Sequence, residues 1–245
     1  MRRALIRSFA VVSYLAFLAS FSAFAAFVCG LIPAHDGGPG GAFAAVAVDL
    51  GLVALFGVTH SVMARQSFKR LLTRVVAPAA ERSLFVLVAS AELAFLTYAW
   101  RPFPGWTIWS AAGPVASVLS GVQFVGFGIV LVSSFLIDHF ELFGLRQAFA
   151  QRSPPPSFKT PALYRHVRHP LYLGFLTAFW AAPRMGLGQL CLAAAFTAYI
   201  LVAIRLEERD LVRAHGERYR RYQREVPMLL PAPAGRGVER QERTA

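Results

Sequence analysis

The residues best suited to chemistry lie in one short stretch, Tyr164–Gly174, which reads YRHVRHPLYLG. It places two arginines and two histidines between Arg165 and His169, directly before a proline. Proline disfavours helix at the residue before it and suits the first position of a new helix, so a helix is expected to begin at Pro170. The free N–H groups of a helix start attract an anion, which arginines can hold through forked hydrogen bonds. The stretch therefore predicts an anion-binding turn or, alternatively, a positive flank that orients a membrane helix.

A second polar cluster follows the apolar run that ends near residue 204. It opens with two adjacent glutamates, and a glycine, two tyrosines and a proline follow at short spacing. These residues are Glu207, Glu208, Gly216, Tyr219, Tyr222 and Pro227. Carboxylates in this position suit the hydroxyl or ammonium groups of a ligand. The alternative is a solvated helix face, on which the glutamates lie beside Arg209 and Arg213.

The order and spacing of these clusters resemble a known superfamily. The sequence RHPLYLG, an apolar hairpin, EE, G-x-x-Y-x-x-Y and VP, over the last third of the chain, is similar to the isoprenylcysteine carboxyl methyltransferases and phospholipid methyltransferases, which are integral membrane enzymes that use S-adenosylmethionine. Earlier segments are similar to the methanethiol S-methyltransferase branch, which lies close to the NnrU-type proteins. These segments are GVTHSVMAR at 57–65, ERS at 81–83, WRP at 100–102 and DHFELFGLRQ at 138–147.

The resemblance implies a membrane methyltransferase with S-adenosylmethionine as cofactor and a small thiol, methanethiol, as acceptor, giving dimethyl sulfide. Three alternatives stay open: an isoprenylcysteine or lipid acceptor, an NnrU-like protein that is not a methyltransferase, and a b-type haem protein. For the haem protein, axial ligands could come from the histidines His60, His139, His166 and His169. The crowding of two of these histidines beside Pro170 argues against a helical ligand pair. No separate metal site is expected.

The resemblance also implies that the cofactor binds between the two polar clusters. One wall consists of Arg165, His166, Arg168, His169, Pro170, Tyr172 and Gly174, and the other of Glu207 and Glu208. Arginines suit the carboxylate of the cofactor, and a glutamate suits its ribose or ammonium group. The Tyr172 ring can lie against the cationic sulfonium. Which of the two glutamates contacts the cofactor stays open.

Methyl transfer to a thiol sets a further requirement. A thiolate and a sulfonium lose their charges as they react, so an apolar, water-poor pocket favours the transition state. A thiol resembling cysteine, with a pKa of about 8.5, is mostly protonated at neutral pH and needs a base or a cation. Four ionisable residues near the ends of apolar runs are candidates for this catalytic role: His139, Asp138, His60 and Glu141. Asp138 can orient His139 as a base pair, or each can be an interfacial side chain that meets lipid headgroups.

Composition indicates an integral membrane protein. The chain has 245 residues, of which 56% are hydrophobic, and a formal net charge of +12. In a soluble protein such a charge would suggest nucleic acid as a partner. Here the basic residues lie between long apolar runs, and no nucleic-acid motif is present, so the expected partner is the lipid bilayer.

The apolar runs predict an all-α fold with four long transmembrane helices and a C-terminal helical hairpin. The spans are expected over residues 8–32, 43–63, 83–99 and 114–137, and the hairpin over 171–182 and 187–204. The loop 101–113, with Trp106 and Trp109, suits an interfacial aromatic belt. Residues 1–230 are expected to form one membrane domain and residues 231–245 a disordered tail, with the prolines at 154–156 as a stiff linker.

The distribution of positive charge predicts the topology. Lys and Arg are plentiful before the first span and in the second and fourth loops, and absent from the first loop. The third loop and the hairpin turn hold one each, Arg101 and Arg184. This pattern predicts that both termini and both polar clusters face the cytoplasm of a bacterial inner membrane, where S-adenosylmethionine is made. Cys29 and Cys191 lie in apolar runs and predict no disulfide.

Overall fold

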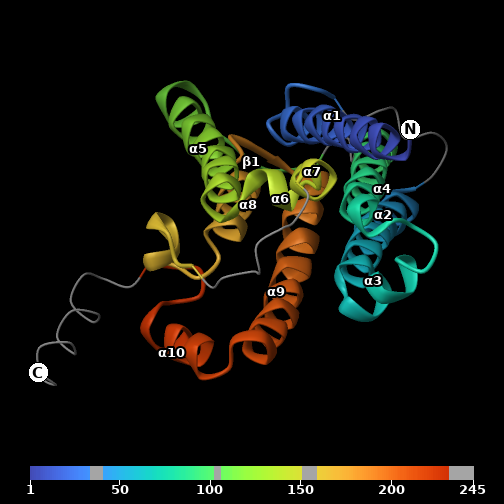
Figure 1. Cartoon of the computed structure of the whole chain (residues 1–245). Coiled ribbons are helices and arrows are strands. Elements are labelled where there is room, and N and C mark those ends of the chain that lie inside the picture. The colour runs from blue at the N-terminus through green and yellow to red at the C-terminus, as the bar shows by residue number, and fades with distance from the viewer. Residues whose placement is uncertain (34–40, 102–105, 151–158, 232–245) are drawn as a thin grey trace, which may run out of the picture.

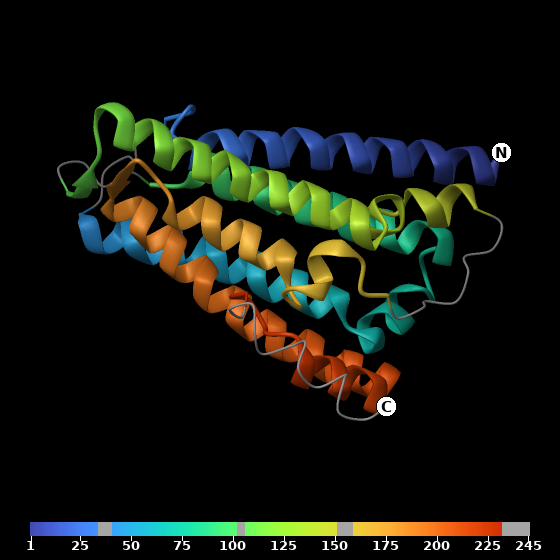
Figure 2. The same cartoon turned by 90° about the vertical axis from the view of Figure 1, so that its left-hand side faces the viewer.

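The computed structural model describes residues 1–33, 41–101, 106–150 and 159–231. Over these residues the chain is mostly helical, and its helices run roughly along one axis (Figures 1 and 2). The elements are α1 (Arg2–Val28), α2 (Ala42–Ala64), α3 (Gln66–Leu72), α4 (Pro78–Ala99), β1 (Thr107–Ser110), α5 (Gly113–Ile137), α6 (His139–Leu142), α7 (Leu145–Phe149), the 3₁₀ helix η1 (Ala162–Arg165), α8 (Pro170–Trp180), β2 (Arg184–Gly186), α9 (Leu187–His215) and α10 (Glu217–Glu225).

Four described helices, α1, α2, α5 and α9, are long and apolar enough to cross a membrane, which makes the chain an integral membrane protein. Large apolar side chains on these helices remain exposed, as contact with lipid requires, for example Val58, Val118 and Leu131. α4, the expected third span, has 22 residues and packs along α1, but it is not among these four and carries Glu81, Arg82 and Glu92. The long fourth member is instead α9, the return helix of the predicted hairpin.

The predicted hairpin is confirmed, and its first helix is short. α8 has 11 residues, which at 1.5 Å per residue is far less than the roughly 30 Å hydrocarbon core of a bilayer. β2 follows, and it pairs with β1 in an antiparallel ribbon, with Thr107 opposite Gly186 and Ser110 opposite Arg184. The all-α expectation is therefore corrected to a mostly helical fold with one small ribbon. Strands of three and four residues are too short to show a periodic pattern.

Two tightly packed helix pairs form the frame of the bundle, α1 with α4 and α5 with α8, and α9 contacts both α8 and α2 (Figure 1). The α5–α8 crossing depends on two glycines. A Cβ atom on Gly174 would lie 2.6 Å from the carbonyl oxygen of Gly126, and one on Gly126 would lie 2.7 Å from the backbone nitrogen of Ala178. The buried amide of Gln123 donates to the carbonyls of Val28 and Ala178 and so joins α1 to this pair.

The two ends of the bundle differ in character. The ribbon lies at one end, and the N-terminus, α3, α6, α7 and α10 gather at the other (Figure 2). Trp109 of the ribbon donates through Nε1 to the carbonyl of Ala182 at 2.9 Å, and both Trp106 and Trp109 are exposed, as an interfacial belt requires. The predicted proline linker and all but the first residue of the predicted tail lie outside the described residues.

Candidate functional site

The RHP stretch folds as a turn that leads into α8. The helix begins at Pro170, as predicted, with His169 as its N-cap residue. The chain after α10 returns to this turn. The backbone N–H of Arg168 donates to Pro227 at 2.9 Å, and that of His169 donates to Met228 at 3.2 Å. The VP segment near the end of the described chain is therefore part of the same structure.

Arg168, His169 and Glu208 form a buried network that joins the two polar clusters. One oxygen of Glu208 accepts from Nε of Arg168 at 2.7 Å and lies 3.0 Å from Nε2 of His169. The other oxygen accepts from the Gln223 amide at 2.9 Å. The three side chains of the network are only 11%, 5% and 15% exposed, in that order. Both oxygens of Glu208 are thus occupied by protein groups.

The Arg168 guanidinium also fixes α10. Its Nη1 donates to the carbonyl of Gln223 at 2.9 Å and to that of Val226. The hydroxyl of Tyr222 donates to the carbonyl of Tyr164, and burial raises the pKa of Tyr222 to about 12, so that the hydroxyl keeps its proton. Charge-assisted bonds in a poorly hydrated site are stronger than neutral ones. The network therefore holds the turn, α9 and α10 in a fixed relation.

A second set of residues keeps its capacity to bind a ligand. Arg165, His166 and Glu207 are exposed, and among the described residues the side chains of Arg165 and His166 make no hydrogen bond or ion pair. The hydroxyl of Tyr172 donates to Glu207 at 3.1 Å. Burial, with the nearby charge of Glu207, raises the pKa of Tyr164, which places the glutamate close to η1. The side chains of Arg165 and His166 and this carboxylate therefore border one region at the start of α8.

The donor set of this region fits S-adenosylmethionine. The Arg165 guanidinium and the ring N–H of His166 match a carboxylate, and Glu207 matches an ammonium group or ribose hydroxyls. The Tyr172 hydroxyl reaches Glu207, and its aromatic ring can face a sulfonium. Two expected cofactor residues belong to the frame instead, because Pro170 is fully buried and Gly174 lies in the α5–α8 crossing.

The structure does not bring Asp138 and His139 together as a base pair. Asp138 ends α5, accepts the backbone N–H of Glu141 at 3.1 Å as the cap of α6, and forms an ion pair with Arg146. His139 is 3% exposed and has both ring nitrogens engaged, Nδ1 with the Ser134 hydroxyl at 2.9 Å and Nε2 with the Tyr14 hydroxyl at 2.8 Å. Neighbouring hydroxyls, rather than the adjacent carboxylate, orient this imidazole.

The two other catalytic candidates lie in different surroundings. Glu141 is partly exposed and lies 3.9 Å from Arg146. His60 is enclosed by aromatic rings. Its ring centroid is 5.3 Å from that of Phe56 and 4.7 Å from that of Phe85. Its Nδ1 atom is buried and has no hydrogen-bond partner among the described residues.

The sequence reasoning missed Tyr14, Ser134 and Gln223 as polar partners in these networks. Gln223 follows directly after the second tyrosine of G-x-x-Y-x-x-Y, so its position beside the cluster was a usable signal. Tyr14 offered none, because its contact with His139 joins residues 125 positions apart and depends on how α1 packs. Ser134 lies about one helical turn before the end of α5. A serine at such a position has several ordinary structural roles, so its residue type alone gave no signal.

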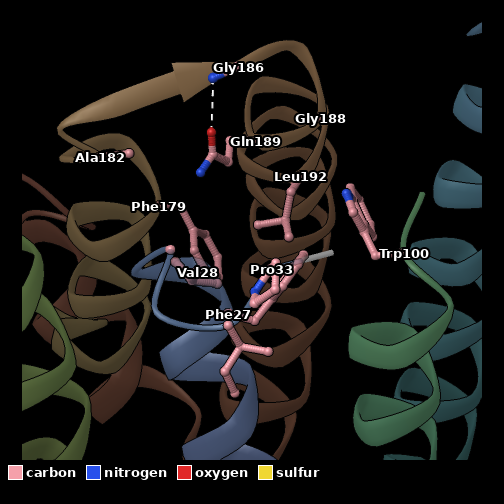
Figure 3. Close-up of a pocket in the computed structure, with 12 residues that line it drawn as sticks. Phe27, Val28, Pro33, Trp100, Phe179, Ala182, Gly186, Gly188, Gln189 and Leu192 are labelled. Carbon is pink, nitrogen blue, oxygen red and sulfur yellow. Dashed lines mark hydrogen bonds between the residues drawn. The ribbon is translucent and has the colours of Figure 1, made fainter. Parts of the chain in front are cut away.

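A cavity of about 220 Å³ lies at the ribbon end of the bundle, away from both polar clusters (Figure 3). Its walls include Phe27, Trp100, Phe179 and Leu192, and Gln189 accepts the backbone N–H of Gly186 at its edge. The charged groups that match the cofactor lie at the start of α8 and late in α9. This apolar cavity is therefore separate from the candidate cofactor site.

Comparison with known proteins agrees with the resemblance seen in the motifs. A family described as NnrU protein matches residues 50–235. The chain is 47% identical over 231 residues to methanethiol S-methyltransferase 1 of Bradyrhizobium diazoefficiens, covering 91% of this chain and 81% of that protein. It is 47% identical over 244 residues to methanethiol S-methyltransferase of Mycobacterium tuberculosis, covering 95% and 98%. The methanethiol S-methyltransferase of Pseudomonas deceptionensis is 48% identical over 204 residues, covering 80% and 77%. No solved structure matches the chain.

Proposed function

We propose a function from one established premise: the chain belongs to the NnrU protein family. The chain is a membrane methyltransferase that transfers a methyl group from S-adenosylmethionine to methanethiol and yields dimethyl sulfide. The observation that carries this proposal is the similarity to three proteins named methanethiol S-methyltransferase, each aligned over at least 77% of its own length. The exposed charged groups around the start of α8 supply a matching cofactor site.

In this site the exposed residues bind the cofactor, and the buried residues behind them keep the site in shape. Arg165 and His166 hold the carboxylate of the cofactor, and Glu207 holds its ammonium group or ribose. The Tyr172 ring borders the sulfonium. When bound, S-adenosylmethionine supplies an electrophilic methyl group on a cationic sulfur. Arg168 and Glu208 act behind these residues, because their mutual bonds keep the turn and α9 in place.

The bilayer gives this chemistry a suitable medium. The thiolate and the sulfonium are both charged before transfer, and both products are neutral at sulfur, so a water-poor site favours the reaction. Apolar side chains fill the interior between α1, α2, α8 and α9, and Phe24, Phe179 and Phe196 are among them. A small apolar thiol can reach such an interior from the membrane.

We further infer that both termini and the cofactor site face the cytoplasm. The basic residues in the first turns of α1, in α3 and in α7 lie at the end of the bundle that also holds α10 (Figure 2). Cytoplasmic loops carry the excess of Lys and Arg. The cofactor is made on that side, which agrees with this orientation.

The proposed reaction is tested directly by product analysis. Purified protein in lipid vesicles is given S-adenosylmethionine and methanethiol, and dimethyl sulfide is measured by gas chromatography. A parallel sample receives a prenylcysteine analogue in place of methanethiol. Dimethyl sulfide from the first sample alone supports the proposal, whereas methylation of the prenylcysteine alone would replace methanethiol by a lipid-like acceptor.

A test of the cofactor site compares matched arginines. Arg165→Gln should weaken binding of S-adenosylmethionine in calorimetry by about one to two decades, because a hydrogen bond to a charged group contributes roughly 1.5–3 kcal/mol. Arg220→Gln, at an exposed position of α10, is the control and should bind as the wild type does. Equal affinity in both variants would show that Arg165 serves only to orient the membrane helix.

A further inference from the structure

The imidazole of His60 is the one candidate base among the described residues whose ring is enclosed and yet makes no hydrogen bond. His139 has both nitrogens engaged by hydroxyls, and Nε2 of His169 lies against Glu208. A general base needs a free lone pair within reach of the proton that it removes. Buried polar atoms normally have partners, so the unbonded ring of His60 requires an explanation.

Aromatic side chains of α2, α4 and α9 surround His60 and form a cluster of Phe56, Phe85 and Tyr199. Phe56 stacks on the imidazole with an interplanar angle of 28°, and Phe85 of α4 approaches from another side at 57°. Phe56 also contacts the ring of Tyr199 on α9, with centroids 6.2 Å apart. Sulfur makes favourable contacts with aromatic rings. A small thiol is therefore the kind of molecule that this aromatic cluster can contact favourably.

Charged and titratable groups of the neighbouring helices α4 and α9 lie near His60 and the aromatic cluster around it. Arg82 of α4 lies close enough to interact electrostatically with His60, and its guanidinium covers the Phe85 ring at 4.7 Å. Glu92 of α4 lies beside Thr59, and Tyr199 of α9 lies beside Ser61, the residues on either side of His60. The positive charge of Arg82 favours the anionic form of a thiol bound nearby.

Helix α9 connects the aromatic cluster around His60 with the candidate cofactor site. A Cβ atom on Gly57, one turn before His60, would lie 2.8 Å from the Tyr199 ring, so α9 packs directly against this part of α2. Tyr199 in turn lies within electrostatic reach of both Tyr172 and Glu207. Tyr199 therefore stands between the base and the residues that border the sulfonium.

We propose that His60 is the catalytic base that takes the proton from methanethiol beside this aromatic cluster. The inference rests on the proposed methyltransferase function. The S–H bond breaks and leaves its electron pair on sulfur, and the proton forms an N–H bond at Nε2, while the buried Nδ1 carries the hydrogen of the neutral ring. The thiolate is then consumed in methyl transfer, and the imidazolium returns its proton to water.

The proposal predicts a pH-dependent defect in His60→Gln. At neutral pH the variant should make dimethyl sulfide about 10²–10⁴ times more slowly than the wild type, the usual contribution of a general base. The deficit should shrink as the pH rises toward the pKa of the thiol. It should also shrink with 2,2,2-trifluoroethanethiol, a more acidic acceptor. His215→Gln, the same substitution at the end of α9, is the control and should show neither effect.

Binding measurements separate this inference from the proposed function. Calorimetry should show that His60→Gln binds S-adenosylmethionine with wild-type affinity. ¹⁹F NMR should show that trifluoroethanethiol binds to both the variant and the wild type. Wild-type turnover in His60→Gln, or a deficit that is constant with pH and acceptor, would overturn the role of His60 while the methyltransferase function stands. No thioether from the wild type under any condition would overturn both.

Discussion

Glu207 and Glu208 are neighbours in the sequence, yet they face different tasks because successive residues of a helix point about 100° apart. Glu208 is enclosed by Arg168, His169 and Gln223, whereas Glu207 is exposed and bonded to Tyr172 alone among the described residues. The motif EE shows that carboxylates are needed here, but only the packing of α9 against the RHP turn separates a structural carboxylate from a ligand-binding one.

This division predicts opposite phenotypes for two adjacent substitutions. Glu208→Ala leaves Arg168 without its carboxylate in a poorly hydrated site and should lower the free energy of unfolding by about 3–5 kcal/mol, as for other broken buried ion pairs. Glu207→Gln should unfold as the wild type does but bind S-adenosylmethionine about one to two decades more weakly. Thermal unfolding in detergent and calorimetry measure the two effects. If the phenotypes are reversed, the assignment of the two glutamates is wrong.

His139 should affect stability in a pH-dependent way. Burial lowers its pKa below the ordinary value, so the unfolded chain, with a histidine pKa of about 6.5, binds the proton more tightly than the folded protein. The stability that depends on neutral His139 is complete above about pH 6.5 and declines as the pH falls below it. Thermal unfolding between pH 5 and 8 should therefore show a smaller acid-side loss in His139→Gln than in the wild type. Parallel curves would mean that this ring does not titrate differently on folding.

At the scale of elements, the short helix α8 depends on its partner for position. It does not span the membrane alone, and its crossing with α5 brings Gly126 and Gly174 into backbone contact. The sequence predicted the helix start at Pro170 and the hairpin that follows, because proline and the apolar run are local signals. It did not reveal that Gly174 serves this crossing, because the partner glycine lies in a helix separated from it by the whole segment from α6 to η1.

A methyl group at this crossing should displace the cofactor site. In Gly174→Ala the added Cβ would meet the carbonyl oxygen of Gly126 at 2.6 Å, and backbone atoms cannot yield without moving a helix. Overpacking of this kind should lower the free energy of unfolding by about 1–3 kcal/mol, and displacement of α8 should also weaken cofactor binding. Gly128→Ala is the matched control, because a Cβ atom there meets no atom within 4 Å. Equal melting temperatures for both variants would contradict a tight crossing.

For the whole molecule, composition and charge were enough to predict a helical membrane protein, since long apolar runs are visible without any tertiary information. The ribbon of β1 and β2 was missed. The helix predicted over 83–99 is present as α4, but it packs along α1 and is not among the four helices long and apolar enough to cross a membrane. Contacts such as Tyr14 with His139 join distant segments. They depend on how the helices are arranged, and no pattern within either segment specifies them.

The orientation of the bundle is open to a direct test. A reporter inserted after Gly41, between α1 and α2, should be active on the outer side of the membrane, and one inserted after Arg74 should be active in the cytoplasm, because the flanking positive charge lies on that side. Enzymatic reporters that work in one compartment only provide the measurement. The reverse pattern would place the cofactor site on the side that lacks S-adenosylmethionine.

The docking of residues 226–228 on the RHP turn also has a consequence for biosynthesis. Backbone bonds from Arg168 and His169 to Pro227 and Met228 complete the turn, and all four membrane-length helices precede that segment. A ribosome therefore synthesises all four of these helices before it makes the residues that close the site. A chain that ends before Val226 would contain the membrane-length helices but lack the segment that completes the RHP turn, so we expect it to be unable to methylate.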